Sequence, residues 1–342
     1  GICWELIQQK KFFPSPKTMI YTIYFGGGTP SVLSTAQIQQ ILATIQANFL
    51  VHSSAEITLE ANPDDLKPEY LQAIYQLGIN RLSIGVQSFD EKITTWMNRS
   101  HEVQQAINCV PAAKEAGFQN ISLDLIFGIP NQSLAEWEMQ LQKAISLEVQ
   151  HLSVYALTVE QKTALHYQVK QKKVQVPEDE SYEQQFLLAD QLLSQAGFEH
   201  YELSNYAKPH FHSLHNSAYW RNVPYLGVGP AAHSFDGNKR HWNVRNNSKY
   251  LQSIENKQLA IEEEEILTPE IRYQEHIMTH LRKQSGIELA YLQRYLEVDF
   301  EQKYQAELAD FIQQGWMYKT EKGYALSPQG WLMSDAIIAE LF

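Results

Sequence analysis

The alternation of apolar and amphipathic segments constrains the fold of this chain most. Short runs rich in β-branched residues, typical of buried strands, alternate with longer runs at helical spacing. The expected strands are residues 21–25, 56–61, 81–86, 120–127 and 151–157. The expected helices between them are residues 35–49, 68–77, 90–97, 102–116 and 134–147. Strand ends recur roughly every 33 residues, as in a β/α barrel. A doubly wound open sheet alternates similarly, so the pattern predicts an α/β fold of either kind.

Three helix starts carry a serine followed three residues later by Gln or Glu, which is the pattern of a capping box. These pairs are Ser34 with Gln37, Ser88 with Glu91, and Ser133 with Glu136. They support the helix starts expected from periodicity.

The alternation extends in both directions. Helices expected at 161–171 and 182–195, followed by a strand at 201–203, would add one more barrel unit. A helix at 3–12 precedes the first strand, so we expect another strand upstream of residue 1. Residues 1–203 are therefore predicted to form the barrel, with its first strand missing upstream.

The rest of the chain has a different composition. Residues 204–261 are rich in Asn, His, Gly and aromatic residues with little periodicity, which predicts a long functional loop region. The acidic run Glu262–Glu265 marks the expected boundary of a C-terminal domain, residues 262–342. Its expected helices and small hairpin resemble a winged helix. Acidic residues outnumber basic ones there, so we expect a lid or partner-docking module and no DNA binding.

The overall composition argues against several classes of protein. The formal net charge of −12 argues against a nucleic-acid surface. No apolar run approaches the ~20 residues of a membrane span, and no signal peptide is visible. The two cysteines, Cys3 and Cys109, imply no disulfide framework, so a cytoplasmic location is expected.

Three consecutive glycines end the first expected strand. A P-loop would need Gly-Lys-Ser/Thr, which is missing, and the dinucleotide fingerprint would need glycine where Ser31 stands. Glycine lacks Cβ, so a ligand can lie against bare backbone groups at Gly26, Gly27 and Gly28. Pro30 pushes the preceding Thr29 towards an extended conformation. The segment predicts a backbone cradle for a small polar ligand.

Polar side chains interrupt or follow the other strands. Glu60 and Asp124 stand inside apolar runs, where a carboxylate is costly unless it is hydrogen-bonded. One such carboxylate would most simply accept bonds from nearby loops; two beside a triple-glycine turn favour the hydroxyls of a ligand. Gln87 follows the third strand, and Arg99 is either a solvated charge or a clamp for a carboxylate.

Five sequence motifs together resemble radical S-adenosylmethionine (SAM) enzymes. The resemblance is to the branch that contains oxygen-independent coproporphyrinogen III oxidase and the HemW-type heme chaperones, and the HemW type is the more similar. The motifs are Phe-Gly-Gly-Gly-Thr-Pro (25–30), Glu-Ala-Asn-Pro (60–63), Asn-Arg-Leu-Ser-Ile-Gly-Val-Gln-Ser-Phe (80–89), Asn-Arg-Ser-His (98–101) and Asp-Leu-Ile-Phe-Gly-Ile-Pro (124–130). The resemblance implies a partial (β/α) barrel followed by a family-type C-terminal domain.

The resemblance also implies a SAM site. The residues it assigns to SAM are Gly26, Gly27, Gly28, Thr29, Glu60, Gln87, Arg99, Asp124 and Ala156. The last two glycines and the threonine would hold the methionine amino group. The two carboxylates would meet ribose hydroxyls or a second SAM. The glutamine and arginine would bind polar ends, the arginine a carboxylate, and the alanine would line the adenine or sugar side.

The sequence departs from the family at one point. In this family a 4Fe–4S cluster reduces and cleaves SAM, and its CxxxCxxC motif is absent here. Cys3 and Cys109 cannot supply the several thiolates a cluster needs and are expected to be small buried hydrophobes. We expect the motif just upstream of Gly1; the alternative is a relative without a cluster.

The segment His-Asn-Ser-Ala-Tyr-Trp (215–220) resembles the HNxxYW element of HemW-type proteins. The resemblance makes His215 a candidate axial heme ligand, with Tyr219 and Trp220 offering flat faces for a porphyrin. Alternatively, His215 hydrogen-bonds within the loop while Trp220 packs on the barrel. Relatives often carry Cys in place of Leu214, which leaves the second heme ligand open.

Two further expectations concern the same loop region. His210, His212 and His215 have spacings that a metal site could use, but no neighbouring carboxylate or thiol completes a set, so no metal ligands are expected in this chain. Arg240 could meet a heme propionate.

The implied function is that of a heme chaperone, which binds heme and SAM and delivers heme to acceptor proteins, membrane-associated ones among them. The first alternative is the oxidase, which removes propionate carboxyl groups from coproporphyrinogen by radical chemistry. The second is a binding module whose barrel has lost its cluster.

Overall fold

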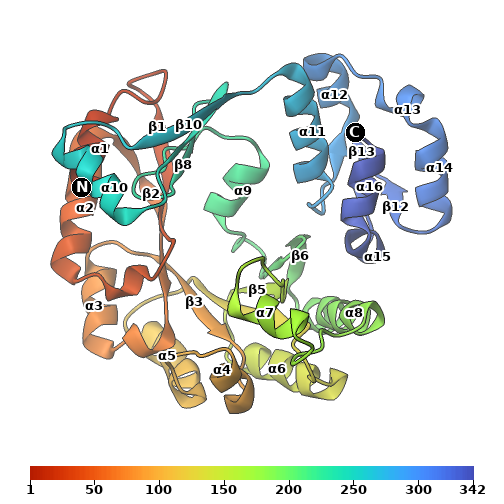
Figure 1. The fold of residues 1–342 in the computed structure, drawn as a ribbon, viewed down its shortest axis with the longest axis horizontal. Helices are drawn as coiled ribbons and strands as arrows, with labels where there is room; N and C mark the ends of the chain where they lie inside the picture. Colours follow the sequence, from red (N-terminus) through yellow and green to blue (C-terminus); the bar gives the residue numbers. More distant parts are fainter.

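The computed structural model describes residues 1–342, and its main feature is a seven-stranded sheet bent into a partial barrel (Figure 1). Five parallel strands lie side by side in chain order: β1 (Met19–Phe25), β2 (Leu50–Ala61), β3 (Arg81–Gln87), β4 (Ile121–Phe127) and β5 (His151–Ala156). These are the five strands expected from the sequence, and the predicted partial barrel is confirmed.

Helices cover the outer face of the sheet (Figure 1). They are α2 (Thr35–Asn48), α3 (Pro68–Gln76), α4 (Glu91–Trp96), α5 (Val103–Glu115), α6 (Leu134–Ser146) and α8 (Asp179–Gln195). Of the two remaining helices of this part, α1 (Ile2–Gln8) contacts α2, and α7 (Ala164–Lys170) precedes α8 in the chain. Apolar strand residues such as Leu59, Leu82, Ile84 and Leu123 are fully buried. Their burial stabilises the structure by about 1.5–3 kcal/mol each and leaves the alternate residues to face inward.

Two of the three expected capping boxes are confirmed. Ser34 and Ser133 cap α2 and α6 with reciprocal bonds from residues three positions later. The third was wrong: Asp90 caps α4 by accepting from the Lys92 N–H at 2.7 Å. The Ser88 hydroxyl instead donates to the Gln140 side chain at 3.2 Å, which ties the loop to α6.

The run at 201–203 is a strand that follows two helices, as predicted, but it does not pair with β5, so the expected extra barrel unit is only partly confirmed. β6 (Glu199–Glu202) turns directly into β7 (Asn205–Ala207), and β7 pairs antiparallel with β5. A parallel neighbour needs a crossover of a dozen or more residues, whereas a tight turn allows only an antiparallel hairpin. The hairpin therefore forms the last edge of the partial barrel.

Residues 204–261 contain more regular structure than their composition predicted. Besides β7 they hold α9 (Leu214–Trp220), β8 (His233–Phe235), β9 (Lys239–Asn243) and α10 (Asn247–Glu255). The acidic run expected at a boundary forms β10 (Ile261–Ile266), which completes a small antiparallel sheet in the order β10-β9-β8. Cross-strand pairing, which local periodicity does not report, organises this region.

A buried carboxylate joins the first helix to this small sheet. Glu5 of α1 is fully buried and accepts hydrogen bonds from the Gly229 N–H, the Asn243 amide and the Tyr250 hydroxyl at 3.0, 2.6 and 2.6 Å. The donors come from segments more than 220 residues away in sequence. Charge-assisted bonds of this kind compensate for the desolvation of the carboxylate.

The C-terminal part is mainly helical with a small sheet, as predicted. Its helices are α11 (Pro269–His280), α12 (Leu289–Leu296), α13 (Phe300–Lys303), α14 (Gln305–Gln313), α15 (Pro328–Leu332) and α16 (Ser334–Glu340). Its strands are β11 (Ile287–Glu288), β12 (Met317–Lys319) and β13 (Gly323–Leu326), in the order β11-β13-β12. α15 packs against α8, so this part contacts the barrel directly. None of the helices combines the length and the apolar character that a membrane crossing requires.

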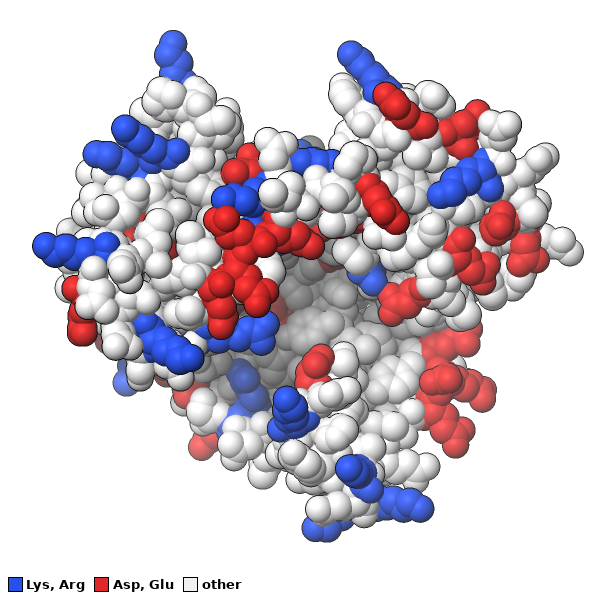
Figure 2. Space-filling view, turned by 45° about the horizontal axis from the view of Figure 1, so that its top comes forward, with Lys and Arg blue, Asp and Glu red and all other residues white.

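The surface between the barrel and the C-terminal part is deeply hollowed (Figure 2). Acidic side chains gather along one rim of this hollow, and basic ones lie around it (Figure 2). In Figure 1, α9 stands in the opening between the sheet and the C-terminal helices. The helix that carries the HNxxYW element, α9, therefore faces both the barrel and the C-terminal part.

Two stacked histidines in α11 make stability depend on pH. The rings of His276 and His280 lie 3.7 Å apart, and burial lowers the pKa of His276 to about 4 and that of His280 to about 3. The unfolded chain binds these protons near pH 6.5, so it holds more protons than the folded chain between pH 6.5 and about 4. We expect stability to fall as pH drops through this window, by up to about 1.4 kcal/mol per pH unit for each ring. Urea unfolding at pH 7.5 and at pH 5.5 measures the loss of unfolding free energy between the two pH values. This loss should be smaller in His276→Gln than in the wild type. An equal loss in both proteins would contradict the role of His276.

Candidate functional site

The inner face of the sheet carries a polar cavity of about 280 Å³. Side chains alternate between the two faces of a strand, so the apolar residues of one face imply that their neighbours point inward. The lining residues come from the strands, from the β6–β7 turn and from α9. They are Tyr24, Glu60, Arg81, Ser83, Asp124, Ser153, Tyr155, Ser204, Asn205 and Asn216.

Glu60 connects this cavity to the triple-glycine turn. One carboxylate oxygen accepts from the Tyr24 hydroxyl at 2.8 Å and the other from the Gly27 N–H at 3.1 Å. Gly27 and Gly28 have φ of 76° and 74°, in the left-handed region, and open space lies where their Cβ atoms would be. A Cβ on Gly26 would come within 2.6 Å of the Tyr24 ring. The turn is thus held by Glu60 and leaves bare backbone facing outward, as the sequence predicted.

Asp124 lies deeper in the same cavity. The Ser83 hydroxyl donates to it at 3.3 Å, and Ser153 pairs with it in the register of β4 and β5. Burial raises the pKa of Asp124 to about 6, against the opposing effects of Ser153 and Arg81. The Arg81 side chain is almost fully buried, and its Nε has no hydrogen-bond partner. A buried donor without a protein partner is unusual and leaves room for an acceptor from a ligand or an ordered water.

Gln87 and Arg99 form a second group at the end of β3. Gln87 has φ of 67°, uncommon for a non-glycine residue, and its side chain accepts from the Tyr155 hydroxyl at 3.0 Å. Arg99 donates to the Asn62 side chain at 2.8 Å and to the Gly85 carbonyl at 2.9 Å, while its buried Nε has no partner. Gly85 is needed between them, because a Cβ there would approach Gln87 and Arg99 to 3.0 and 3.3 Å.

Tyr155 joins the two groups, since it lines the cavity and also bonds Gln87. The structure therefore brings Glu60 and Asp124 together directly and places Gln87 and Arg99 beside them through this tyrosine. Ala156 is exposed at the carboxyl end of β5, and Thr29, whose side chain caps nothing, follows the glycines.

Sequence reasoning missed several cavity residues, chiefly Tyr24, Arg81, Tyr155 and Asn216. A signal existed for Arg81, because it stands in alternation with Ser83 opposite the apolar Leu82 and Ile84. No local signal existed for Asn216, because only the docking of α9 carries it to the cavity.

His215 of α9 packs against β1, the strand that leads to the glycine turn. Its Nδ1 is 3.0 Å from the Thr22 hydroxyl and its Nε2 is 3.1 Å from the Tyr219 hydroxyl. Its ring stacks on Tyr24 with centroids 4.6 Å apart, and Tyr24 in turn bonds Glu60. Burial lowers the pKa of His215 to about 4, so the imidazole is neutral at physiological pH. Trp220 turns away from this contact and lines a separate pocket.

A buried carboxylate of β2 fixes the start of α9. Glu56 accepts from the backbone N–H groups of Leu214 and His215 at 3.1 and 3.0 Å. The Ser213 side chain accepts from the Asn216 N–H at 3.2 Å. Together these contacts occupy the free N–H groups of the first helical turn and hold α9 against the sheet.

The other candidate ligands of the loop region have protein partners. His212 pairs with Glu199 at 2.7 Å and stacks on Tyr201, so it does not join His215. No group of three or more His, Cys, Asp or Glu residues is placed to hold a metal ion. Arg240, expected to be free for a propionate, makes two hydrogen bonds to Glu275 at 2.7 and 3.2 Å.

The two cysteines lie on different helices and form no disulfide. Cys109 is buried in α5, where burial raises the pKa of its thiol to about 12. Cys3 is partly exposed in α1, so the expectation of burial was correct only for Cys109.

Two family models match this chain. The model described as the radical SAM superfamily matches residues 8–144, and the HemN C-terminal domain matches residues 267–333. The chain is also similar to a solved structure, coproporphyrinogen III oxidase (HemN) from Escherichia coli. The TM-score is 0.83 at 21% identity over 99% of this chain and 81% of that one. At this identity the likeness shows the fold alone.

Curated relatives resemble the chain over nearly its whole length. The heme chaperone HemW of Bacillus subtilis is 32% identical, covering 92% of this chain and 84% of its own. That of Lactococcus lactis is 30% identical, covering 94% and 86%, and that of Synechocystis is 32% identical, covering 94% and 83%. The chain therefore belongs to the HemW heme chaperone family of the radical SAM superfamily, as its motifs predicted.

Proposed function

We propose that this protein is a heme chaperone, which binds heme and SAM and passes heme to acceptor proteins. The observation that carries this proposal is the docking of α9. The helix with the HNxxYW element touches the SAM-type cradle through His215, Tyr24 and Glu60. A heme site built on this helix would therefore adjoin the SAM site.

The cavity residues fit SAM. We propose that the glycine turn meets its methionine part, that Glu60 and Asp124 accept bonds from its hydroxyls, and that Arg99 and Gln87 meet its polar ends. Two observations support this placement: the buried Nε atoms of Arg81 and Arg99 lack partners, and the backbone at Gly27 and Gly28 is open. Ala156, exposed at the end of β5, would lie beside the sugar or adenine.

The residues present do not fit the 4Fe–4S cluster that the superfamily implies. Such a cluster needs several thiolates, and this chain offers two distant cysteines and no other group able to hold a metal. What the residues of this chain supply is binding: a cradle for SAM and a neutral imidazole for heme iron.

We propose His215 as an axial ligand of the heme iron. A neutral imidazole presents a lone pair, and the low pKa of His215 keeps the ring in that form. Nε2 is paired with the hydroxyl of Tyr219, a residue that is 43% exposed, and iron binding at Nε2 requires this hydroxyl to move aside. Thr22 on Nδ1 would then orient the ring from behind, as metal-bound histidines usually require.

The test is titration of the purified chain with hemin, followed by absorbance. We expect His215→Ala to lose the spectrum of the histidine-ligated species. Tyr219→Phe should bind hemin about 2- to 10-fold more tightly, because no hydrogen bond to Nε2 has to be broken. The two variants form a matched pair on one helix. An unchanged spectrum in His215→Ala would contradict the ligand assignment, and weaker binding in Tyr219→Phe would show that the hydroxyl contributes to the site.

The recipient proteins and the compartment belong to the same proposal. We place the protein in the cytoplasm, where two free cysteines remain reduced, and propose heme-binding acceptor proteins, including membrane-associated ones, as partners. The acidic surface argues against nucleic acid as a partner.

A further inference from the structure

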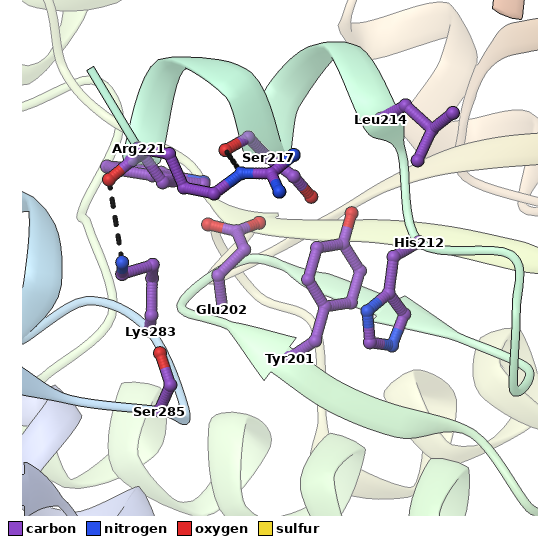
Figure 3. A pocket seen from close by; sticks show the side chains of 9 residues that line it. Tyr201, Glu202, His212, Leu214, Ser217, Arg221, Lys283 and Ser285 are labelled. Atoms are coloured by element: carbon purple, nitrogen blue, oxygen red, sulfur yellow. Dashed lines mark hydrogen bonds between the residues drawn. The ribbon is translucent and has the colours of Figure 1, made fainter. Parts of the chain in front are cut away.

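A second pocket, of about 300 Å³, lies on the other side of α9, where the barrel meets the C-terminal part (Figure 3). It is lined by residues of β6, of the loop before α9, of α9 and its C-terminal end, and of the loop after α11: Tyr201, Glu202, His212, Leu214, Ser217, Trp220, Arg221, Lys283 and Ser285. It is separate from the cavity of Glu60 and Asp124, with which it shares no lining residue.

Two cations of this pocket have no acidic partner. Lys283 donates only to the Trp220 carbonyl, at 3.5 Å, and Arg221 uses its Nε on the Ser217 carbonyl at 3.1 Å (Figure 3). Burial lowers the pKa of Lys283 to about 8; the Glu288 charge opposes this shift and the Arg221 charge adds to it. Neighbouring cations that make no ion pair favour an anion between them.

The pocket also holds one carboxyl group, that of Glu202. Glu202 is almost fully buried and receives hydrogen bonds from the Asn205 side chain and the Ser204 backbone. Burial raises the pKa of Glu202 to about 7, so near neutral pH the group is partly protonated. Figure 3 shows its carboxyl group pointing from β6 towards α9.

The remaining walls are apolar or aromatic. Leu214 is 47% exposed although it lies in a pocket, and Trp220 lies on the same face of α9. The Tyr201 and His212 rings stack at 4.2 Å and form the floor between them. A pocket with flat apolar walls and a cationic end suits a planar aromatic ligand that carries a carboxylate.

One of the two cations, Lys283, belongs to the C-terminal part and is held in the pocket by backbone hydrogen bonds on either side of it. The Leu203 N–H donates to the Arg282 carbonyl at 2.9 Å, and the Gln284 N–H donates to the Tyr201 carbonyl at 3.1 Å. These bonds flank Lys283 and hold it over β6. The pocket is complete only when both parts of the chain are in contact.

We propose that this pocket binds a propionate carboxylate of the heme cargo, with Lys283 and Arg221 as its counter-ions and the porphyrin edge against Trp220 and Leu214. This inference rests on the proposed heme-chaperone function, and it does not depend on which residue ligates the iron. Heme bound here would bridge the barrel and the C-terminal part.

The test compares hemin with hemin dimethyl ester, in which both carboxylates are blocked, in titrations of the full chain. We expect the wild-type protein to prefer hemin by about tenfold or more, which corresponds to about 1.4 kcal/mol. Lys283→Gln and Arg221→Gln should each remove most of this preference, and Lys283→Arg should retain it. Lys170→Gln, an exposed lysine without partners, is the matched control and should behave as the wild type.

The outcomes separate the two proposals. If the wild-type protein binds hemin and its ester equally, or if the preference survives in Lys283→Gln and Arg221→Gln, the carboxylate site is overturned while heme binding stands. If it binds neither compound, the proposed function fails and this inference fails with it. If inorganic phosphate at the concentration of the assay abolishes the preference, the pocket is a general anion site and the assignment to the heme carboxylate is overturned.

Discussion

Replacing Glu60 with glutamine is expected to reduce the affinity for SAM by about 10- to 100-fold. Both carboxylate oxygens of Glu60 accept hydrogen bonds, whereas a glutamine side chain has only one acceptor oxygen and no charge. One carboxylate oxygen holds the Gly27 N–H and the other accepts from Tyr24. Hydrogen bonds to a charged group contribute about 1.5–3 kcal/mol, and the proposed bond to a SAM hydroxyl belongs to the same class. Isothermal titration with SAM measures the loss.

A matched control for Glu60→Gln is Glu263→Gln, because Glu263 is an exposed carboxylate on β10. It changes the net charge by the same amount without touching the cavity. Circular dichroism should show the same fold for both variants. SAM binding that is equally strong in Glu60→Gln and Glu263→Gln would contradict the placement of SAM at this carboxylate.

Glu5→Ala is expected to lower the free energy of unfolding by about 3–5 kcal/mol, the largest stability effect we predict. Removing the carboxylate leaves the Gly229 N–H, the Asn243 amide and the Tyr250 hydroxyl without their acceptor in a region closed to water. Each unsatisfied donor costs about 1–3 kcal/mol. α1 should also separate from the small sheet, because this network is what joins them.

Urea unfolding followed by fluorescence measures this difference. Glu5→Gln keeps the size of the side chain and one acceptor oxygen, so its effect should be intermediate. Glu115→Ala removes an exposed carboxylate from α5 and should change stability by less than about 0.5 kcal/mol. Equal midpoints for Glu5→Ala and Glu115→Ala would show that the network contributes nothing to stability.

Local patterns predicted the parallel part of the fold well. A strand such as β3 alternates apolar and polar residues, and a helix such as α6 begins at a serine with its own hydrogen-bonding partner. These signals depend on residues close together in the chain. The same is true of the glycine turn, whose open backbone needs only the absence of Cβ at Gly27 and Gly28.

Local patterns failed where distant segments decide the structure. The run at 201–203 reads as a strand and is one, but its antiparallel partner β7 lies between it and β5. Residues 204–261 have weak periodicity because β8, β9 and β10 are short and stabilise one another across the sheet. Arg240 looked free in the sequence, and only the fold brings Glu275 to it.

The sequence by itself determined the family, the parallel α/β order and the residue types of the SAM cradle, because each depends on short motifs and on their order along the chain. Only the tertiary structure decided which of these residues meet. Glu56 holds α9 against β1, so His215 reaches the strand of the SAM cradle while the opposite face of the same helix meets Lys283. The physical reason is that buried hydrogen bonds and ring contacts between residues more than 150 positions apart select one packing, and no local pattern reports them.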